Sequence, residues 1–226
     1  MSLIAEDMLL LLLDDEKGTI VGTSHLQIVL GGAMLIELAT TGTVIVEEKK
    51  GMWKSAKVRV QPGSLPDDVL LRRAADAVAE KERSGQDLVT RLGKGVQDEL
   101  LGRLEQRGVL ERKEDKVLGL FPRRRWPTVD STHEDAVRRQ LTAALVQGVQ
   151  PDQHTACLIA LLAAIDRAHK VVDRDGLPAG QVRKRAKEIA QGEWAATAVR
   201  DAISASTAAV AAGVAAATTA ATTSGS

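Results

Sequence analysis

The feature that most constrains the fold is an apolar helix pattern that ends at a glycine and runs directly into a short strand. Residues 30–39 are apolar or small apart from Glu37, Gly42 follows, and residues 44–46 are Val-Ile-Val. Glycine favours the left-handed conformation that closes a helix, and β-branched residues favour extended backbone. The same order recurs at residues 100–110 around a second glycine. Such a unit is typical of a scaffold that presents a loop rather than of a catalytic centre.

The hydrophobic residues are almost all aliphatic. The chain has 226 residues, of which 44% are hydrophobic, yet it contains only three Trp, one Phe and no Tyr. A core of Leu, Val, Ile and Ala favours helix-on-helix packing. The fold class that we expect is mainly α: a single-domain helical bundle with short β-hairpins over residues 1–217. Residues 218–226 are predicted to form a disordered Ala/Thr/Ser tail.

Charge and cysteine content exclude several classes of protein. Lys plus Arg and Asp plus Glu are balanced at 30 each, so the whole-chain charge gives no argument for nucleic-acid binding. The scarcity of aromatic residues also argues against binding of single-stranded nucleic acid by base stacking. Cys157 is the only cysteine, so no intrachain disulfide is expected, and its apolar neighbours predict a buried thiol rather than a nucleophile.

The apolar run at residues 8–13 is predicted to be part of a buried first helix. It is far shorter than the roughly 20 residues that a membrane span needs. It also lacks the basic flank and the small-residue cleavage site of a signal peptide. These features predict a cytoplasmic location.

The remaining pattern predicts further helices and a first hairpin. Residues 44–46 are expected to pair with residues 58–60. Capping boxes are predicted where Ser24 precedes Gln27 and where Ser131 precedes Glu134. The expected helices span about Leu3–Leu13, Ser24–Thr40, Asp67–Glu82, Val96–Arg107, Ser131–Gln147, Cys157–Ala168, Gln181–Gln191 and Glu193–Ala217.

A second hairpin is predicted around a charged tip at residues 111–116. Residues 109–110 would form its first strand, and the apolar residues 117–121 its second. An irregular, strongly basic connector is expected at residues 122–127. The candidate membrane-contacting residues of the hairpin are Val117, Leu118, Leu120 and Phe121; those of the connector are Arg123, Arg124, Arg125 and Trp126.

Three segments resemble the Golgi phosphoprotein 3 family and its bacterial relatives: residues 3–7 with the leucine run after them, residues 32–39, and residues 104–110 with their hairpin. The resemblance extends over roughly the whole chain, and the Ala- and Arg-rich composition is typical of a bacterial member. It implies a mostly helical domain with one protruding β-hairpin and no catalysis. It also implies a peripheral membrane protein that binds phosphatidylinositol 4-phosphate.

In eukaryotic members a Trp and three Arg frame the phosphate pocket. When the shared motifs are matched without gaps, the Trp position falls on Gly22 and the Arg positions on Gly31, Lys94 and Gln97. Of these four, only Lys94 retains a charge. The resemblance therefore implies that Lys94 is a remnant of the lipid pocket.

No pattern of residues points to catalysis, to a metal or to a cofactor. His25, His133, His154 and His169 are widely scattered and are interpreted as surface or cap residues. The chain has no phosphate-binding loop, dinucleotide fingerprint or nucleophile elbow. We therefore predict no catalytic residues, no metal ligands and no cofactor.

The basic connector combines charge with an amphipathic anchor. Each basic residue near an anionic lipid surface contributes about 1 kcal/mol, and Trp suits the headgroup boundary. In the alternative interpretation, Trp126 packs into the core and the arginines pair with neighbouring Glu residues. The sequence leaves these two interpretations equally open.

The function that we expect is non-enzymatic, peripheral binding of anionic phospholipid at the inner face of the membrane. The nearest alternative is a homo-oligomeric scaffold in which the apolar strand of the hairpin joins subunits. A winged-helix nucleic-acid module is less favoured, because its recognition helix at residues 96–107 would carry three acidic side chains. No nucleic-acid partner is therefore expected.

Overall fold

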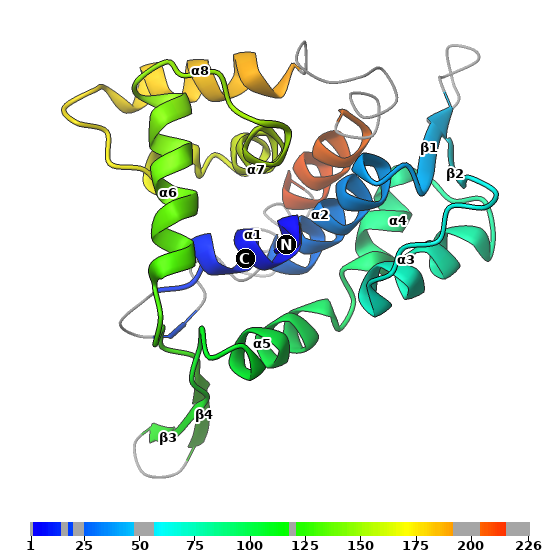
Figure 1. Ribbon diagram of the computed structural model, residues 1–226, viewed down its shortest axis with the longest axis horizontal. Helices are drawn as coiled ribbons and strands as arrows, with labels where there is room; N and C mark the ends of the chain where they lie inside the picture. Colours follow the sequence, from blue (N-terminus) through cyan, green and yellow to red (C-terminus); the bar gives the residue numbers. More distant parts are fainter. Residues whose placement is uncertain are drawn as a thin grey trace, which may run out of the picture.

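The fold is mainly α with two short antiparallel hairpins, as the sequence predicts. A computed structural model describes residues 2–14, 18–19, 25–47, 57–117, 121–191 and 204–215. Figure 1 shows the helices packed around α1, with one hairpin projecting away from the helical body. Among the described helices, none combines the length and the apolar content needed to cross a bilayer.

The elements follow one another along the chain with short connections. The helices are α1 (Ile4–Leu11), α2 (Leu26–Thr40), α3 (Val69–Ala79), α4 (Gly85–Leu92), α5 (Val96–Gln106), α6 (Thr132–Leu145), α7 (Gln153–Ala164), the 3-10 turn η2 (Ala168–Lys170), α8 (Ala179–Ala190) and a last helix over residues 204–215. The strands are β1 (Val44–Glu47), β2 (Lys57–Val60), β3 (Lys113–Val117) and β4 (Phe121–Arg125).

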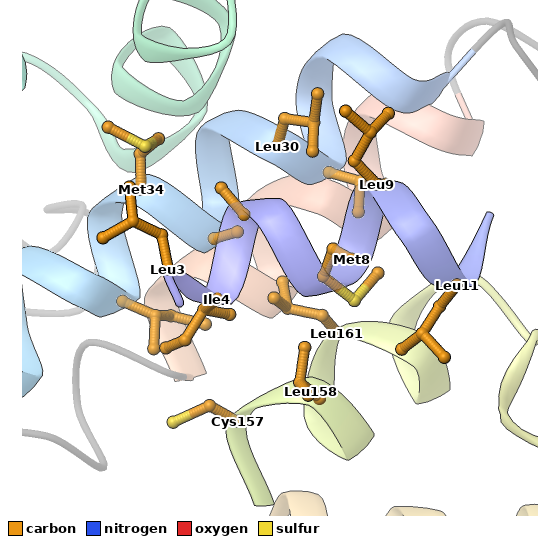
Figure 2. Packing of buried hydrophobic residues seen from close by; sticks show 14 of the residues in the cluster. Leu3, Ile4, Met8, Leu9, Leu11, Leu30, Met34, Cys157, Leu158 and Leu161 are labelled. Atoms are coloured by element: carbon orange, nitrogen blue, oxygen red, sulfur yellow. The ribbon is translucent and has the colours of Figure 1, made fainter. Parts of the chain in front are cut away.

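The first helix lies at the centre of the molecule. All eight residues of α1 are buried, which confirms the predicted buried first helix. Figure 2 shows Met8 and Leu9 of α1 among side chains of α2 and α7, including Leu30 and Leu161. Residues 155–162 of α7 are also all buried. The core is therefore the contact of α1 with α2 and α7.

The helix-to-strand units form as their glycines predict. Gly42 and Gly108 both adopt positive φ, at 72° each, a conformation that side chains with a Cβ rarely tolerate. Thr43 N–H then bonds Leu38 O at 2.8 Å, which closes α2. The first hairpin pairs β1 with β2 antiparallel, in the predicted register of Val44 with Val60.

Two predictions about helix starts need correction. Ser131 has helical backbone angles and its side chain caps no N–H, so the predicted box with Glu134 is wrong. Asp130, one residue earlier, accepts the Thr132 N–H instead, at 2.9 Å, because its short carboxylate reaches this free amide. Ser24 lies outside the described residues. Helix α4 was not predicted; Ser84 begins it by accepting the Asp87 N–H.

The second hairpin differs from its prediction in the placement of charge. The charged residues form the strands: Glu114 pairs with Arg124, and Asp115 with Arg123. The predicted irregular connector is therefore mostly strand β4. A strand needs an apolar face only where one face of its sheet is buried. In a hairpin that projects into solvent, oppositely charged residues on facing strands stabilise the pairing instead.

Helices α2 and α4 meet through backbone rather than through side chains. A Cβ added at Gly31 of α2 would lie 1.8 Å from the carbonyl oxygen of Val89. A Cβ at Gly93, just after α4, would lie 1.7 Å from the carbonyl oxygen of Gln27. Neither helix can carry a larger residue at this crossing unless the two helices move apart.

We expect Gly31→Ala to lower the free energy of unfolding by about 3 kcal/mol or more, because overpacking against backbone cannot be relieved by a side-chain rotation. Urea denaturation measures the loss. Gly102→Ala on α5 is the matched control, since nothing lies within 4 Å of its added Cβ. That control gains about 0.5–1 kcal/mol from helix propensity. Equal stability of the two variants would contradict the close helix crossing.

Candidate functional site

The projecting hairpin β3–β4 is the candidate site. Strands β3 and β4 contact chiefly each other, and Figure 1 shows them beyond the ends of α5 and α6. Five residues per strand extend the hairpin by about 17 Å. Residues 111–125 carry six basic and three acidic side chains, a net charge of +3 in a chain whose total is zero. The hairpin is therefore a cationic projection on a neutral molecule.

Some of this charge is paired within the hairpin. Arg124 Nε lies 3.7 Å from Glu114 Oε1, and Arg112 also contacts Glu114. Lys113 pairs with Glu111 at 3.1 Å. All of these side chains are well exposed, so their attraction is weak and is screened by salt. An external anion can compete for the same arginines.

The apolar residues of the hairpin lie at its far end. Val117 and Phe121 are the outermost residue pair of the ladder. Leu118 and Leu120 come between them in the sequence and lie outside the described residues. The backbone of Arg123 pairs with Asp115, so all three predicted arginines belong to strand β4. From its base to its far end, the hairpin therefore consists of charged strands followed by an apolar sequence.

Trp126 holds the base of the hairpin on the helical body. It is partly buried and packs against the core, as the second of the two sequence interpretations expected. Its backbone N–H donates to the carbonyl oxygen of Gly18 at 2.9 Å. A bridge between Leu110 and Thr128 and a bond from Glu111 N–H to Pro127 O complete the base. The indole therefore lies at the root of the hairpin, away from its apolar end.

The structure does not bring Lys94 to the hairpin. Lys94 is exposed just before α5, and the hairpin follows the opposite end of this helix. The eleven residues of α5 separate the two by about 16 Å. Lys94 lines a groove of about 380 Å³ whose arginines, Arg73 and Arg91, are already paired with Glu99 and Glu80.

The other positions implied by the family's phosphate pocket cannot supply charge. Gly31 faces the backbone of α4, as described above, so an arginine there would clash with Val89. Gln97 is half-buried and neutral, and Gly22 lies outside the described residues. In the described part of the chain, Lys94 is thus the one cation at these positions.

A polar network that the sequence did not reveal surrounds the start of α1. The Glu6 carboxylate, 1% exposed, pairs with Arg103 of α5 at 3.1 Å and with Arg107, which directly follows α5, at 2.8 Å. Arg103 also donates two hydrogen bonds to Asp68, at 3.0 and 2.7 Å. The first helix is thereby fixed to the helix that carries the hairpin.

Asp7 fixes α1 to the start of two more helices. Its two oxygens each accept a hydrogen bond of 2.7 Å, one from His133 of α6 and one from His154 of α7. The interpretation of these histidines as surface or cap residues missed their bonds to Asp7, because a partner 126 or 147 positions away gives no local signal. Burial raises the pKa of Asp7, but the bonds from His154 and His133 outweigh it, so the pKa is lowered overall. The Asp7 bond raises the pKa of His154.

The remaining titratable groups near α1 have structural roles. Burial raises the pKa of Glu37, whose carboxylate accepts the Ile4 N–H at 2.6 Å. Cys157 is fully buried, which confirms the predicted buried thiol, and this burial raises its pKa to about 12. Within the described ranges, no three side chains gather as metal ligands.

The bonds of Asp7 with His133 and His154 make the free energy of unfolding decrease at both alkaline and acidic pH. The raised pKa of His154 gives stability that is present below about pH 6.5 and is lost as the pH rises through the raised value. The lowered pKa of Asp7 gives stability that is present above about pH 4 and is lost on acidification. We expect Asp7→Asn to cost about 3 kcal/mol at pH 6 and to remove the alkaline decline.

Urea denaturation between pH 4 and 9 measures both effects. Asp76→Asn is the control, since Asp76 is exposed on α3. A variant at Asp7 with the pH profile of the unsubstituted chain would contradict the assigned role of the histidine pair.

The comparisons with known proteins agree with this architecture. None of the curated proteins matches the chain significantly. The model of one family, Golgi phosphoprotein 3 (GPP34), matches residues 4–206 and thus all but the ends of the chain. The match includes α1 with its buried carboxylates, the α2 unit and the projecting hairpin. The chain belongs to the Golgi phosphoprotein 3 family.

Proposed function

We propose that this protein binds anionic phospholipid membranes through the β3–β4 hairpin. The observation that supports the proposal is the combination of net positive charge along the hairpin with apolar residues at its far end. Charged strands near an anionic surface gain about 1 kcal/mol per net basic residue, or about 3 kcal/mol here. This is enough for weak, reversible association that depends on salt.

The apolar end adds a second contribution. Residues 117–121 read Val-Leu-Gly-Leu-Phe, and a sequence of this kind at the end of a projection can enter the headgroup region of a bilayer. Trp126 anchors the hairpin on the body in this arrangement, and Lys94 does not take part. The inner leaflet, which carries the anionic lipids, is the surface that we expect to be bound.

We do not propose that the protein recognises phosphatidylinositol 4-phosphate specifically. The backbone of α4 fills the space that an arginine would need at Gly31. A headgroup pocket with one lysine cannot surround a phosphate with charge-assisted hydrogen bonds. We therefore propose that the lipid is selected by surface charge. Membership of a non-enzymatic family supports a role without catalysis.

Liposome flotation of the hairpin variant Arg123→Gln, Arg124→Gln, Arg125→Gln tests the electrostatic part. This variant reduces the net charge of residues 111–125 to zero, so we expect binding to anionic vesicles to be lost. The matched control replaces three cations remote from the hairpin by Gln: Lys57 of β2, Arg73 of α3 and Lys81 just after α3. It loses the same charge and should float like the unsubstituted protein.

The flotation experiment compares three kinds of vesicle: neutral vesicles, vesicles that contain phosphatidylglycerol, and vesicles doped with phosphatidylinositol 4-phosphate. We expect flotation with both anionic kinds at equal surface charge, and a decline as salt is added. Flotation with the doped vesicles alone would contradict selection by charge. Equal binding by the hairpin and control variants would exclude the hairpin as the contact.

The variant Leu118→Asp separates membrane insertion from subunit contact. We expect it to weaken flotation about tenfold while the molar mass measured by light scattering stays the same. A change of mass with undiminished flotation would support the homo-oligomeric alternative instead.

A further inference from the structure

A second basic surface lies at the end of the molecule opposite the hairpin. Figure 1 shows α8 across the top of the helical body, with β3 and β4 at the bottom. Residues 166–188 carry seven basic and four acidic side chains, a net charge of +3. Since the whole chain is neutral and the hairpin also carries +3, the rest of the chain has a net charge of −6. The positive charge is thus concentrated at two opposite ends.

The cations of this second surface are exposed and largely unpaired. We name as the α8 basic surface the exposed residues Lys170, Arg174, Arg183, Lys184 and Lys187. In the part of the chain that the structure describes, Lys170, Arg174 and Lys187 have no ion-pair partner. Lys184 is 81% exposed and only reaches Glu188 at 4.0 Å. By contrast, most other cations of the described chain are paired with carboxylates.

His169 shows that cations from three segments come together here. Arg183 of α8 donates to His169 Nε2 at 3.2 Å while it holds Asp166 with two bonds, of 2.7 and 3.0 Å. Partial burial and the charges of Arg183, Lys170 and Arg174 lower the pKa of His169, against the opposite effect of Asp166. The residual field around this imidazole is therefore positive, even with Asp166 present.

The surface continues beyond α8 on the side of α6. Lys170 lines an open groove of about 690 Å³ together with Arg138 and Arg139 of α6. Arg138 is engaged by Glu134 and by the carbonyl of Val171, whereas Arg139 is exposed. The acidic residues of this groove, Asp135 and Asp173, bond to Ser131 and to the Asp175 N–H.

We propose that the α8 basic surface binds an acidic peptide segment of a partner protein. The cations come from the α6 groove, from η2 and the segment after it, and from a little more than one turn of α8. These are more separate positions than one phosphate group can contact. A chain with several carboxylates matches this spacing and gains from each of them. The choice of a protein partner rests on the proposed function, because a molecule held on a membrane by its hairpin turns α8 away from the lipid.

Fluorescence anisotropy with a labelled deca-glutamate peptide tests the proposal on the full-length protein at about 50 mM salt, where exposed charges are weakly screened. We expect salt-sensitive binding that falls about tenfold in the variant Lys170→Gln, Lys184→Gln, Lys187→Gln. The charge-matched variant at Lys57, Arg73 and Lys81 should change the affinity less than about twofold. Undetectable binding, or an equal loss in both variants, would overturn the proposal.

The imidazole of His169 reports on occupancy. Bound carboxylates offset the nearby cations, so we expect the pKa of His169 measured by NMR to rise when the peptide is added. A pKa of His169 that stays constant while the peptide is bound would place the binding elsewhere and overturn the assignment.

The hairpin variant distinguishes this proposal from the membrane proposal. It should lose vesicle flotation and retain peptide binding, so that either proposal can fail alone. If the α8 variant loses flotation while the hairpin variant retains it, the α8 surface is a membrane contact and a protein partner is ruled out there.

Discussion

The structure depends on two carboxylates that are buried at the start of its central helix. Every residue of α1 is buried, so Glu6 and Asp7 cannot stay ionised unless other elements supply partners. Arg103 of α5 and Arg107 at its end pair with Glu6, and one histidine each from α6 and α7 bonds to Asp7. Removing one member leaves an uncompensated buried charge, which is costly, so these contacts fix the arrangement of three helices around α1.

This arrangement also determines where the hairpin lies. The hairpin leaves the chain between α5 and α6, the two helices that the carboxylates hold against α1, and Trp126 anchors its base. The helical body therefore gives a rigid origin to a projection that has few contacts of its own. Together with the α8 basic surface, the hairpin places positive charge at both ends of a neutral protein. In our account one end meets lipid and the other meets an acidic protein segment.

Local patterns predicted most of the fold, and long-range pairing explains what they missed. Glycines at 42 and 108, the register of β1 with β2 and the burial of α1 and α7 follow from short-range preferences. The Asp7 histidines could not be found this way, because the three residues are far apart in sequence. The hairpin was predicted at the right place, but its strands were misplaced because exposed strands need no apolar face. The structure was also needed to show which of the basic residues lie on the same surface.

The measurement that tests the central claim most directly is hydrogen exchange of the backbone amides, with and without phosphatidylglycerol vesicles. Our account predicts that vesicles slow exchange in residues 113–125 and leave α8 and the amides of the α1 core unchanged. Slower exchange in α8 with no change in the hairpin would contradict it, because the opposite end of the molecule would then be in contact with the membrane.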